Sequence, residues 1–213
     1  MDASTPDVGA LLGLAPVIPV IVIDDDSVAV PLARALVAGG LPVLEVTLRT
    51  DFALSAIKRI AEEVPDAVVG AGTVLTPADV SAAVAAGSRF LVSPGCTPRL
   101  LDAMLDSGAA PLPGTATASE VIALLEYGLT HAKFFPARPA GGVPYLKSLA
   151  GPLPGVRFCP TGGIDVTTAP EFLALPNVAC VGGSWLAPAD AVAGRDWGRV
   201  EELARQAAAL RVA

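Results

Sequence analysis

The chain has 213 residues, of which 53% are hydrophobic and 16% are charged, and its formal net charge is -7. This composition supplies enough apolar material for a large core and excludes an intrinsically disordered chain. The lysine and arginine residues are scattered instead of clustered, so the sequence shows no sign of a surface that binds nucleic acid.

The first predicted element is an apolar run at 16–23, which has the length of a strand and stops at Asp24. It is much shorter than the roughly 20 apolar residues of a membrane-spanning helix. The N-terminus also lacks the basic start and long apolar segment of a signal peptide. Cys96, Cys159 and Cys180 are odd in number and widely spaced, which indicates neither disulfides nor a zinc site. We therefore expect a soluble, cytoplasmic protein that uses neither a membrane nor nucleic acid as a partner.

Short apolar runs alternate with longer Ala- and Leu-rich segments along the whole chain. Runs that are nearly continuous in Val, Ile and Ala are typical of buried parallel strands, because helices cover such strands. We predict strands at 17–23, 42–47, 67–71, 89–93, 110–113, 131–134, 156–160 and 178–182.

The segments between these strands have helical periodicity. Thr76-Pro77 and Thr97-Pro98 place proline at the first helical position, and Gly39 and Gly87 follow helical segments as typical stop signals. We predict helices at 27–38, 51–63, 76–86, 97–107, 118–127 and 143–150, with a further helix at 5–13 and one long last helix at 190–211.

Eight strand–helix units follow one another without a linker or a change in composition. This favours a single (β/α)8 TIM barrel domain over residues 1–213, an α/β fold with an N-terminal helix. The alternative is an open doubly wound sheet, which would need a glycine-rich phosphate turn after its first strand. Asp24-Asp25-Asp26 occupies that place, so the barrel is the favoured prediction.

Polar residues end the second and third predicted strands, where the active site of such a barrel lies. By alternation Glu45, Thr47 and Arg49 share one side of the second strand. Charged groups that project into a barrel are costly unless they are paired or used. A purely structural Glu45–Arg49 ion pair is the alternative explanation. The small residues before Thr73 would leave space and put Thr73 at the rim, although a simple turn explains them as well.

Lys133 is the most unusual residue, because it lies in the middle of an apolar strand. An ordinary lysine is almost entirely protonated at neutral pH and is then no nucleophile. Burial beside Phe135 and Pro136 would favour the neutral amine, whereas a nearby Glu45 would favour the ammonium. His131 falls on the same side but deeper, so we expect it to be a core or floor residue. A lysine that merely reaches solvent at the strand end is the alternative.

Paired glycines end the seventh and eighth predicted strands, at Gly162-Gly163 and at Gly182-Gly183, the latter followed by Ser184. Glycine lets backbone N–H groups approach an anion closely, and helix N-termini after such turns favour negative charge. The loops after strands 7 and 8 are the usual phosphate site of these barrels. We therefore predict a phosphate site there, with plain tight turns as the alternative.

With these residues assembled, the sequence resembles the 2-keto-3-deoxy-6-phosphogluconate (KDPG) aldolase family, also described as 4-hydroxy-2-oxoglutarate aldolases. The resemblance extends from Pro16 to Ser184. Its most specific segments are 44–50 (LEVTLRT), 70–75 (GAGTVL), 93–95 (SPG), 133–137 (KFFPA) and 157–164 (RFCPTGGI). The segments 112–117 and 138–142 look variable, and the second of them could adjust which aldehyde fits.

The resemblance implies a class I aldolase that acts on a small phosphorylated sugar acid, commonly as a homotrimer and without metal or cofactor. It implies that Lys133 forms the Schiff base and that Glu45 is the general acid and base. The implied substrate-binding residues are Arg49 and Thr73 for the pyruvate carboxylate, Pro94 and Phe135 for the pyruvate pocket, Thr161 for the aldehyde part, and Gly162, Gly163, Gly183 and Ser184 for the phosphate.

Three alternatives remain open from the sequence. The enzyme could prefer unphosphorylated 4-hydroxy-2-oxoglutarate or the galactonate epimer of KDPG. A metal-dependent class II aldolase is disfavoured, because His131 is the only histidine. A non-catalytic barrel that binds phosphosugars would account for the glycine pairs but leaves Lys133 and Glu45 unexplained.

Overall fold

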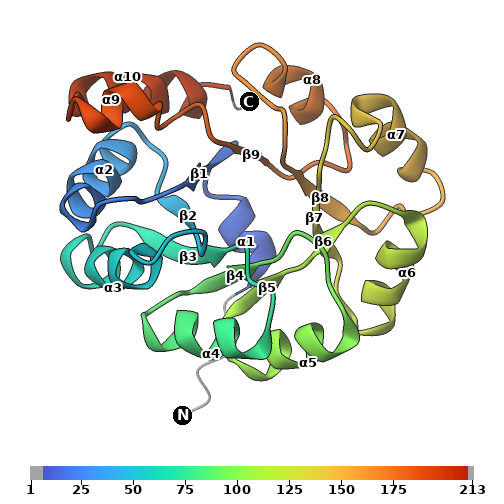
Figure 1. The fold of residues 1–213 in the computed structure, drawn as a ribbon. Coiled ribbons are helices and arrows are strands. Elements are labelled where there is room, and N and C mark those ends of the chain that lie inside the picture. The colour runs from blue at the N-terminus through green and yellow to red at the C-terminus, as the bar shows by residue number, and fades with distance from the viewer. Residues whose placement is uncertain (1–6, 211–213) are drawn as a thin grey trace.

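The computed structural model describes residues 7–210, with strands at the centre, one short N-terminal helix lying across them and the other helices outside (Figure 1). The strands are β1 (Val17–Ile21), β2 (Val43–Thr47), β3 (Val68–Gly72), β4 (Phe90–Val92), β5 (Ala110–Leu112), β6 (Gly114–Thr115), β7 (His131–Phe134), β8 (Arg157–Pro160) and β9 (Val181–Gly183). The helices are α1 (Val8–Leu12), α2 (Asp26–Ala38), α3 (Ala53–Glu63), α4 (Pro77–Ala85), α5 (Pro98–Asp106), α6 (Ala118–Glu126), α7 (Gly142–Leu149), α8 (Ala169–Leu173), α9 (Ala189–Ala193) and α10 (Trp197–Ala208). Within this part of the chain no helix is long and apolar enough to cross a membrane.

The described strands form a parallel sheet in the order β5-β4-β3-β2-β1-β9 and a second one in the order β6-β7-β8. The first strand therefore pairs with the last. A doubly wound sheet reverses its strand order near the first strand, so this arrangement excludes it. The predicted α/β class is confirmed, and the larger sheet is parallel and curled, whereas closure into an eight-stranded barrel stays a prediction.

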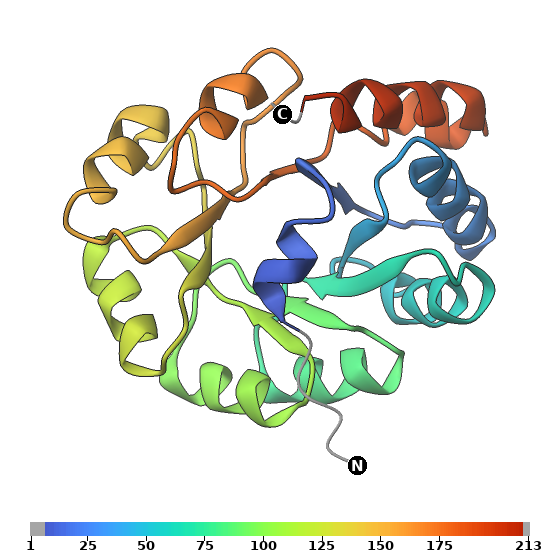
Figure 2. The ribbon, with the colours of Figure 1, turned by 180° about the vertical axis from the view of Figure 1, so that it is seen from behind.

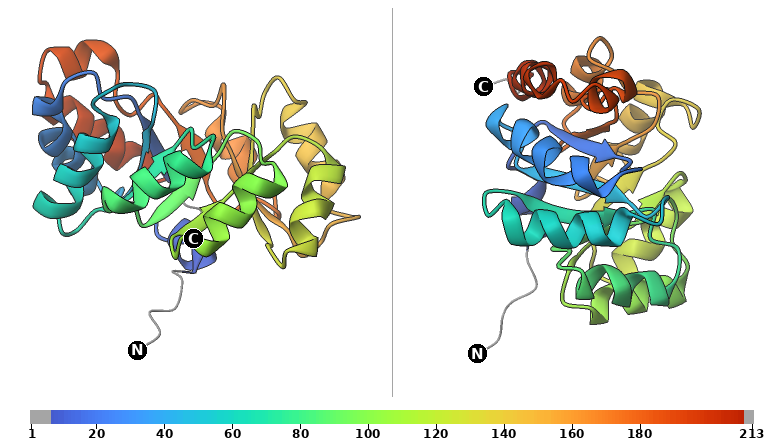
Figure 3. Two further views of the ribbon diagram at one scale, coloured as in Figure 1. Left: turned by 60° about the horizontal axis from the view of Figure 1, so that its bottom comes forward. Right: turned by 60° about the vertical axis from the view of Figure 1, so that its left-hand side comes forward.

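The first and last units also meet through their helices. Gly39 ends α2, and a Cβ there would lie 2.4 Å from Ala204 Cβ in α10, so glycine lets the two helices approach closely. Figure 1 and Figure 3 show α10 beside α2. This helix contact lies beside the pairing of the first strand, β1, with the last strand, β9.

The inner face of the curled sheet carries its own apolar cluster, to which Ile18, Val43, Phe90 and Leu112 contribute. Leu12 of α1 belongs to the same cluster, and Figure 2 shows α1 lying across the strands on that side. His131 begins β7 close to α1, since a Cβ on Gly9 would lie 2.9 Å from His131 Cε1. Because α1 covers the N-terminal ends of the strands, we expect a functional site at their C-terminal ends.

The prediction of one long last helix at 190–211 is wrong within the described residues. The chain forms α9 and α10 instead, separated by Gly194, Arg195 and Asp196. Arg195 has a φ of 53°, which no α-helix continues, and the Asp196 side chain then accepts a hydrogen bond from Arg199 N to start α10. Residue 211 lies outside the described part, as do residues 5 and 6 of the predicted first helix.

Three further differences from the predicted elements concern the strand before Pro113, the helix α8 and the start of the last strand. The predicted strand at 110–113 ends at Leu112 as β5, because Pro113 has no N–H to donate to a neighbouring strand, and Gly114–Thr115 beyond the predicted range forms β6. The helix α8 between the last two strands has only five residues, too few for a legible helical period, and was not predicted. The last strand begins at Val181 instead of Val178, which forms an isolated bridge with Phe158.

Candidate active site

The side chains of Lys133 and Glu45 contact each other in the space enclosed by the strands. Lys133 Nζ lies 3.1 Å from Glu45 Oε1, and the two residues are 5% and 3% exposed. Lys133 comes from β7 and Glu45 from β2, so the fold joins residues that are 88 positions apart. Lysine and glutamate are almost never this buried without a partner. Each is therefore the counterion of the other.

Arg49 does not take part in this pair. It lies exposed two residues beyond the end of β2, and across residues 7–210 no ion pair joins it to Glu45. The alternative of a structural Glu45–Arg49 ion pair is therefore wrong. On the same strand, Thr47 Oγ1 donates to Ile21 O at 3.0 Å and ties β2 to β1.

The backbone around Lys133 is fixed by the neighbouring strand. Lys133 N donates to Pro113 O at 2.9 Å, and Lys133 O accepts from Thr115 Oγ1 at 3.2 Å. The Nζ atom lies 5.4 Å from the centre of the Phe135 ring, within the range of a cation–π contact. Phe135 thus forms one wall beside the amine, as predicted from its position after β7.

Gly72 provides the space that the Glu45 side chain fills. A Cβ on Gly72 would lie 2.2 Å from Glu45 Oε1 and 2.7 Å from Glu45 Cγ. Real Cβ contacts are never this short, so a larger residue would push Glu45 away from Lys133. From the sequence Gly72 was predicted only to be a small residue before Thr73, because nothing near it in the sequence points to Glu45.

Thr73 and Arg49 follow the adjacent ends of β3 and β2. The register pairs Thr47 with Gly72, and Leu48 N donates to Gly72 O at 2.8 Å, so the two strand ends lie at one edge. Thr73 has a φ of 59°, an unfavourable backbone conformation for a β-branched residue. Strained backbone of this kind is concentrated at functional sites, and the role of Thr73 stays a prediction.

Pro94 lies against the strand next to Lys133. Gly114 is paired in register with Lys133, and a Cβ on Gly114 would lie 2.3 Å from the carbonyl carbon of Pro94. Gly114 N also donates to Ser93 Oγ at 3.3 Å. The glycine therefore allows the turn that carries Pro94 to pack directly beside the lysine strand.

Thr161 and the two glycine turns lie together at the ends of β8 and β9. Thr161 is buried and forms a bridge with Gly182, where a Cβ would lie 2.2 Å from Thr161 Oγ1. Gly162 and Gly163 have φ values of 108° and 74°, which favour glycine strongly. Gly182 is thus a second glycine that makes room for a neighbouring side chain, a relation that its place in a Gly-Gly pair did not predict.

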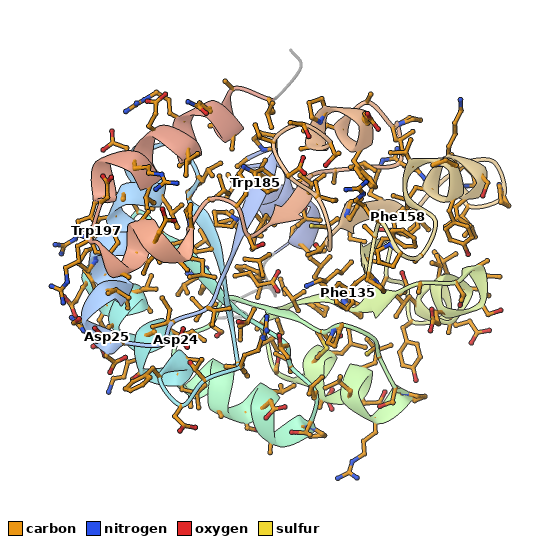
Figure 4. The ribbon with its side chains drawn as sticks, turned by 45° about the horizontal axis from the view of Figure 1, so that its top comes forward. Asp24, Asp25, Phe135, Phe158, Trp185 and Trp197 are labelled. Carbon is orange, nitrogen blue, oxygen red and sulfur yellow. The ribbon has the colours of Figure 1, made fainter. Side chains whose placement is uncertain are left out.

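The second glycine turn carries Gly183 and Ser184. The Trp185 ring fills the place of a Gly183 side chain, since a Cβ there would lie 1.8 Å from Trp185 Cζ3. Ser184 is exposed and lines a cavity of about 580 Å³ with Val20, Asp24 and Arg195. Val20 is the register partner of Glu45, so this cavity reaches the strand next to the buried pair of Lys133 and Glu45. In Figure 4 Asp24 and Asp25 lie across the strands from Phe135.

The histidine lies apart from this arrangement, whereas Cys159 is the register partner of Lys133 on β8. His131 is at the opposite end of β7, near α1, as expected for a floor residue. Burial raises the pKa of the Cys96 thiol to about 11, opposed by a hydrogen bond with Ser93. Among residues 7–210 no group of three or more His, Cys, Asp or Glu side chains could hold a metal ion.

The sequence matches the family model for KDPG and KHG aldolase over residues 8–203. It is 56% identical to the 2-dehydro-3-deoxy-phosphogluconate aldolase of Pseudoalteromonas atlantica, over 91% of this chain and 90% of that protein. It is 51% identical to the KHG/KDPG aldolase of Escherichia coli, over 93% of each chain.

A solved structure from Legionella pneumophila has a similar fold. It is a KDPG aldolase with pyruvate captured at low pH as a covalent carbinolamine intermediate. The TM-score is 0.92 at 50% sequence identity, and the match covers 94% of this chain and 97% of the other.

Proposed function

Because the chain belongs to the KDPG and KHG aldolase family, we propose that it cleaves 2-keto-3-deoxy-6-phosphogluconate into pyruvate and glyceraldehyde 3-phosphate through a Schiff base on Lys133. The observation that carries this proposal is the buried contact of 3.1 Å between Lys133 Nζ and Glu45 Oε1. A structural ion pair alone gives little reason for burying both charges, since burial is costly even for a well-formed pair. An amine nucleophile beside a proton acceptor gives that reason.

The pair suggests how the amine becomes reactive. A proton that moves from the Lys133 ammonium to Glu45 leaves a neutral amine and a neutral carboxylic acid, without changing the net charge of the buried site. The neutral amine attacks the C2 ketone of the substrate, and loss of water gives a protonated imine. Glu45 lies within the distance that direct proton transfer requires.

The protonated imine accepts the electrons of the bond that breaks. Removal of the C4 hydroxyl proton forms the aldehyde and cleaves the C3–C4 bond, whose electron pair passes into the enamine. Protonation of the enamine and hydrolysis then release pyruvate and restore Lys133. General acid–base catalysis of this type contributes about 10²- to 10⁴-fold, and we assign it to Glu45.

The remaining residues bind the two ends of the substrate. We assign the pyruvate carboxylate to Arg49 and Thr73, whose strand ends lie side by side. Pro94 and Phe135 enclose the methyl end of pyruvate, and Thr161 faces the aldehyde part. The phosphate is assigned to the two glycine turns, which lie at adjacent strand ends, namely Gly162, Gly163, Gly183 and Ser184. The positive φ values of Gly162 and Gly163 support this assignment for the first turn.

The decisive test is reductive trapping with pyruvate and borohydride, followed by peptide mass spectrometry. The chain has three lysines, and Lys58 and Lys147 are exposed, so each provides a matched control. We expect a pyruvate adduct on Lys133 that is absent from Lys133→Ala and present in Lys58→Ala and Lys147→Ala. An adduct that persists in Lys133→Ala would refute the assignment.

Cleavage of 4-hydroxy-2-oxoglutarate is a second candidate activity. The Escherichia coli relative carries both activities in its name, KHG/KDPG aldolase, at 51% identity. The same Lys133 and Glu45 chemistry applies to both substrates, because both are 4-hydroxy-2-keto acids. The ratio of the two kcat/KM values decides which substrate this chain prefers.

We also propose that the strands close into one (β/α)8 barrel in a single domain of residues 1–213. The bridges from Phe158 to Val178 and from Thr161 to Gly182 link β8 to β9, which supports closure at that seam. The two sheets are also joined between β5 and β6, which are consecutive parts of one strand, interrupted only at Pro113. Counting β5 and β6 as one then gives eight strands.

A homotrimer in the cytoplasm is the assembly and location that we propose. Val22, Phe52 and Leu75 are 40%, 43% and 56% exposed, and they follow β1, β2 and β3 at the same end of the strands. Exposed apolar side chains at one end of a fold favour contact between subunits. Light scattering during gel filtration should give three times the mass of one chain, and Leu75→Glu should lower it.

A further inference from the structure

Arg138 lies against the first glycine turn of the proposed phosphate site. Ala137 N donates to Thr161 O at 2.8 Å and Arg138 N donates to Gly162 O at 3.1 Å, so two backbone hydrogen bonds join the loop after β7 to this turn. The Cβ, Cγ and Cδ atoms of Arg138 lie 3.1 to 3.3 Å from the position that a Gly163 Cβ would take. The position of the Arg138 side chain is therefore tied to the turn.

The groups assigned to the phosphate are all neutral, whereas a phosphate monoester carries about -1.5 to -2 charges at neutral pH. Asp165 adds a negative charge two residues after Gly163. Hydrogen bonds from Thr167 and Thr168 hold the pKa of Asp165 at about 2, so it is ionised. A phosphate at this turn therefore gains from a nearby cation, and Arg138 is placed to be that cation.

The Arg138 guanidinium has N–H donors that are available to bind a ligand. It is exposed, and Nη1 lies 3.5 Å from Gly163 O, at the outer limit of a hydrogen bond. Within residues 7–210 no carboxylate forms an ion pair with it. Arg138 and Glu171 line one hollow of about 280 Å³, so the Glu171 carboxylate is the group that would compete with a phosphate for the guanidinium. A guanidinium carries five N–H donors and binds phosphate through two parallel hydrogen bonds.

We propose that Arg138 is a specificity-determining residue that supplies the positive charge of the phosphate site and sets the preference for a phosphorylated aldehyde. This inference rests on the proposed aldolase function. It assigns a task to the 138–142 loop, which follows the lysine strand and reaches the phosphate turn through the backbone contacts described above.

The test compares KDPG with 2-keto-3-deoxygluconate, the same sugar acid without phosphate, for wild type, Arg138→Ala and Arg138→Lys. Arg89→Ala is the matched control, because Arg89 is exposed and precedes β4 at the opposite end of the strands. We expect Arg138→Ala to lower kcat/KM for KDPG about tenfold, mainly through KM, and to change that for the unphosphorylated substrate less than about twofold. Arg138→Lys should recover part of the loss, and Arg89→Ala should match wild type.

An equal loss for both substrates would overturn the proposal, since it would mean that Arg138 serves the fold, for example by pairing with Glu171. No loss for either substrate would overturn it as well. A second measurement follows inorganic phosphate through Trp185, whose ring lies on Gly183, in a Trp197→Phe background. Phosphate should bind about tenfold more weakly to Arg138→Ala. Equal binding would count against Arg138.

Failure of the aldolase function itself gives a different pattern. In that case wild type would trap no pyruvate with borohydride, whatever residue occupies position 138. Pyruvate lacks a phosphate, so Arg138→Ala should trap it as wild type does. Normal trapping with an unchanged substrate preference would refute only the assignment of Arg138.

Discussion

The carboxylate of Glu45 lies against the backbone of Gly72, where a Cβ would be 2.2 Å from Glu45 Oε1. Because Gly72 has no side chain, the Glu45 side chain can extend from β2 over β3 toward Lys133. Gly182 has the same relation to Thr161 Oγ1, also at 2.2 Å. At both places a glycine on the next strand makes room for a side chain that the proposed reaction uses.

We expect Gly72→Ala to lower kcat about a hundredfold, because the added methyl group displaces the Glu45 carboxylate from Lys133 and general acid–base catalysis is worth about 10²- to 10⁴-fold. Steady-state cleavage of KDPG measures the loss, and thermal unfolding shows whether the variant is folded. Gly151→Ala is the control, since no atom lies within 4 Å of its Cβ position.

A folded Gly72→Ala variant with the kcat of wild type would show that Glu45 does not depend on this space. In Glu45→Ala, where no carboxylate remains to be displaced, adding Gly72→Ala should cause little further loss of kcat. A further large loss there would mean that Gly72 acts on something other than Glu45.

His131 should remain neutral to lower pH than an ordinary histidine. Burial lowers its pKa from the usual 6.5, opposed by the charge of Asp7 and assisted by that of Arg157. Because the unfolded chain then binds a proton more readily, the stabilising contribution is present above about pH 6.5 and is lost as the pH falls toward the folded-state pKa. His131 is the only histidine, so its NMR titration is free of overlap.

The measurement is this single titration together with urea unfolding between pH 7 and 5. We expect His131→Gln to flatten the pH dependence of the free energy of unfolding in that range. Arg157→Gln should raise the pKa of His131, because it removes a neighbouring positive charge. A midpoint above 6.5 in wild type would contradict the expected direction.

Much of the strand order and of the buried pair of Lys133 and Glu45 could be predicted, because both depend on local patterns. Buried parallel strands are apolar throughout, so Lys133 and Glu45 were conspicuous in β7 and β2. The position of each strand within two or three residues followed from the same apolar runs. What the two charges do to each other required their distance, which only the fold provides.

The remaining features depend on neighbours that are distant in the sequence. Gly72 matters because a side chain from residue 45 lies over it, and no pattern around Gly72 contains that information. Arg138 is one exposed arginine among others until the loop is seen bonded to Gly162. The break between α9 and α10 depends on the positive φ of Arg195, a residue with good helix propensity.

Cys96 should react slowly with alkylating reagents. Its pKa is raised to about 11 by burial, so about 0.1% of the thiol is ionised at pH 8, and the thiolate is the reactive form. We expect the rate of iodoacetamide modification to keep rising above pH 9, where an ordinary thiol levels off. Cys96→Ser identifies its share of the signal against Cys159 and Cys180, which are buried. Rapid modification at pH 7 would contradict this prediction.

The two buried charges of Glu45 and Lys133 should stabilise the fold only together. Glu45→Leu leaves the Lys133 ammonium buried without a counterion, and such a loss typically costs about 3 kcal/mol of the free energy of unfolding. Lys133→Met alone should cost a similar amount, since it leaves the carboxylate unpaired. The double variant Glu45→Leu/Lys133→Met removes both charges and should be more stable than either single variant, because apolar side chains of similar volume replace a buried ion pair at little cost. Urea unfolding of the four proteins gives the coupling energy. Additive losses would show that Lys133 and Glu45 do not stabilise each other across the 3.1 Å contact.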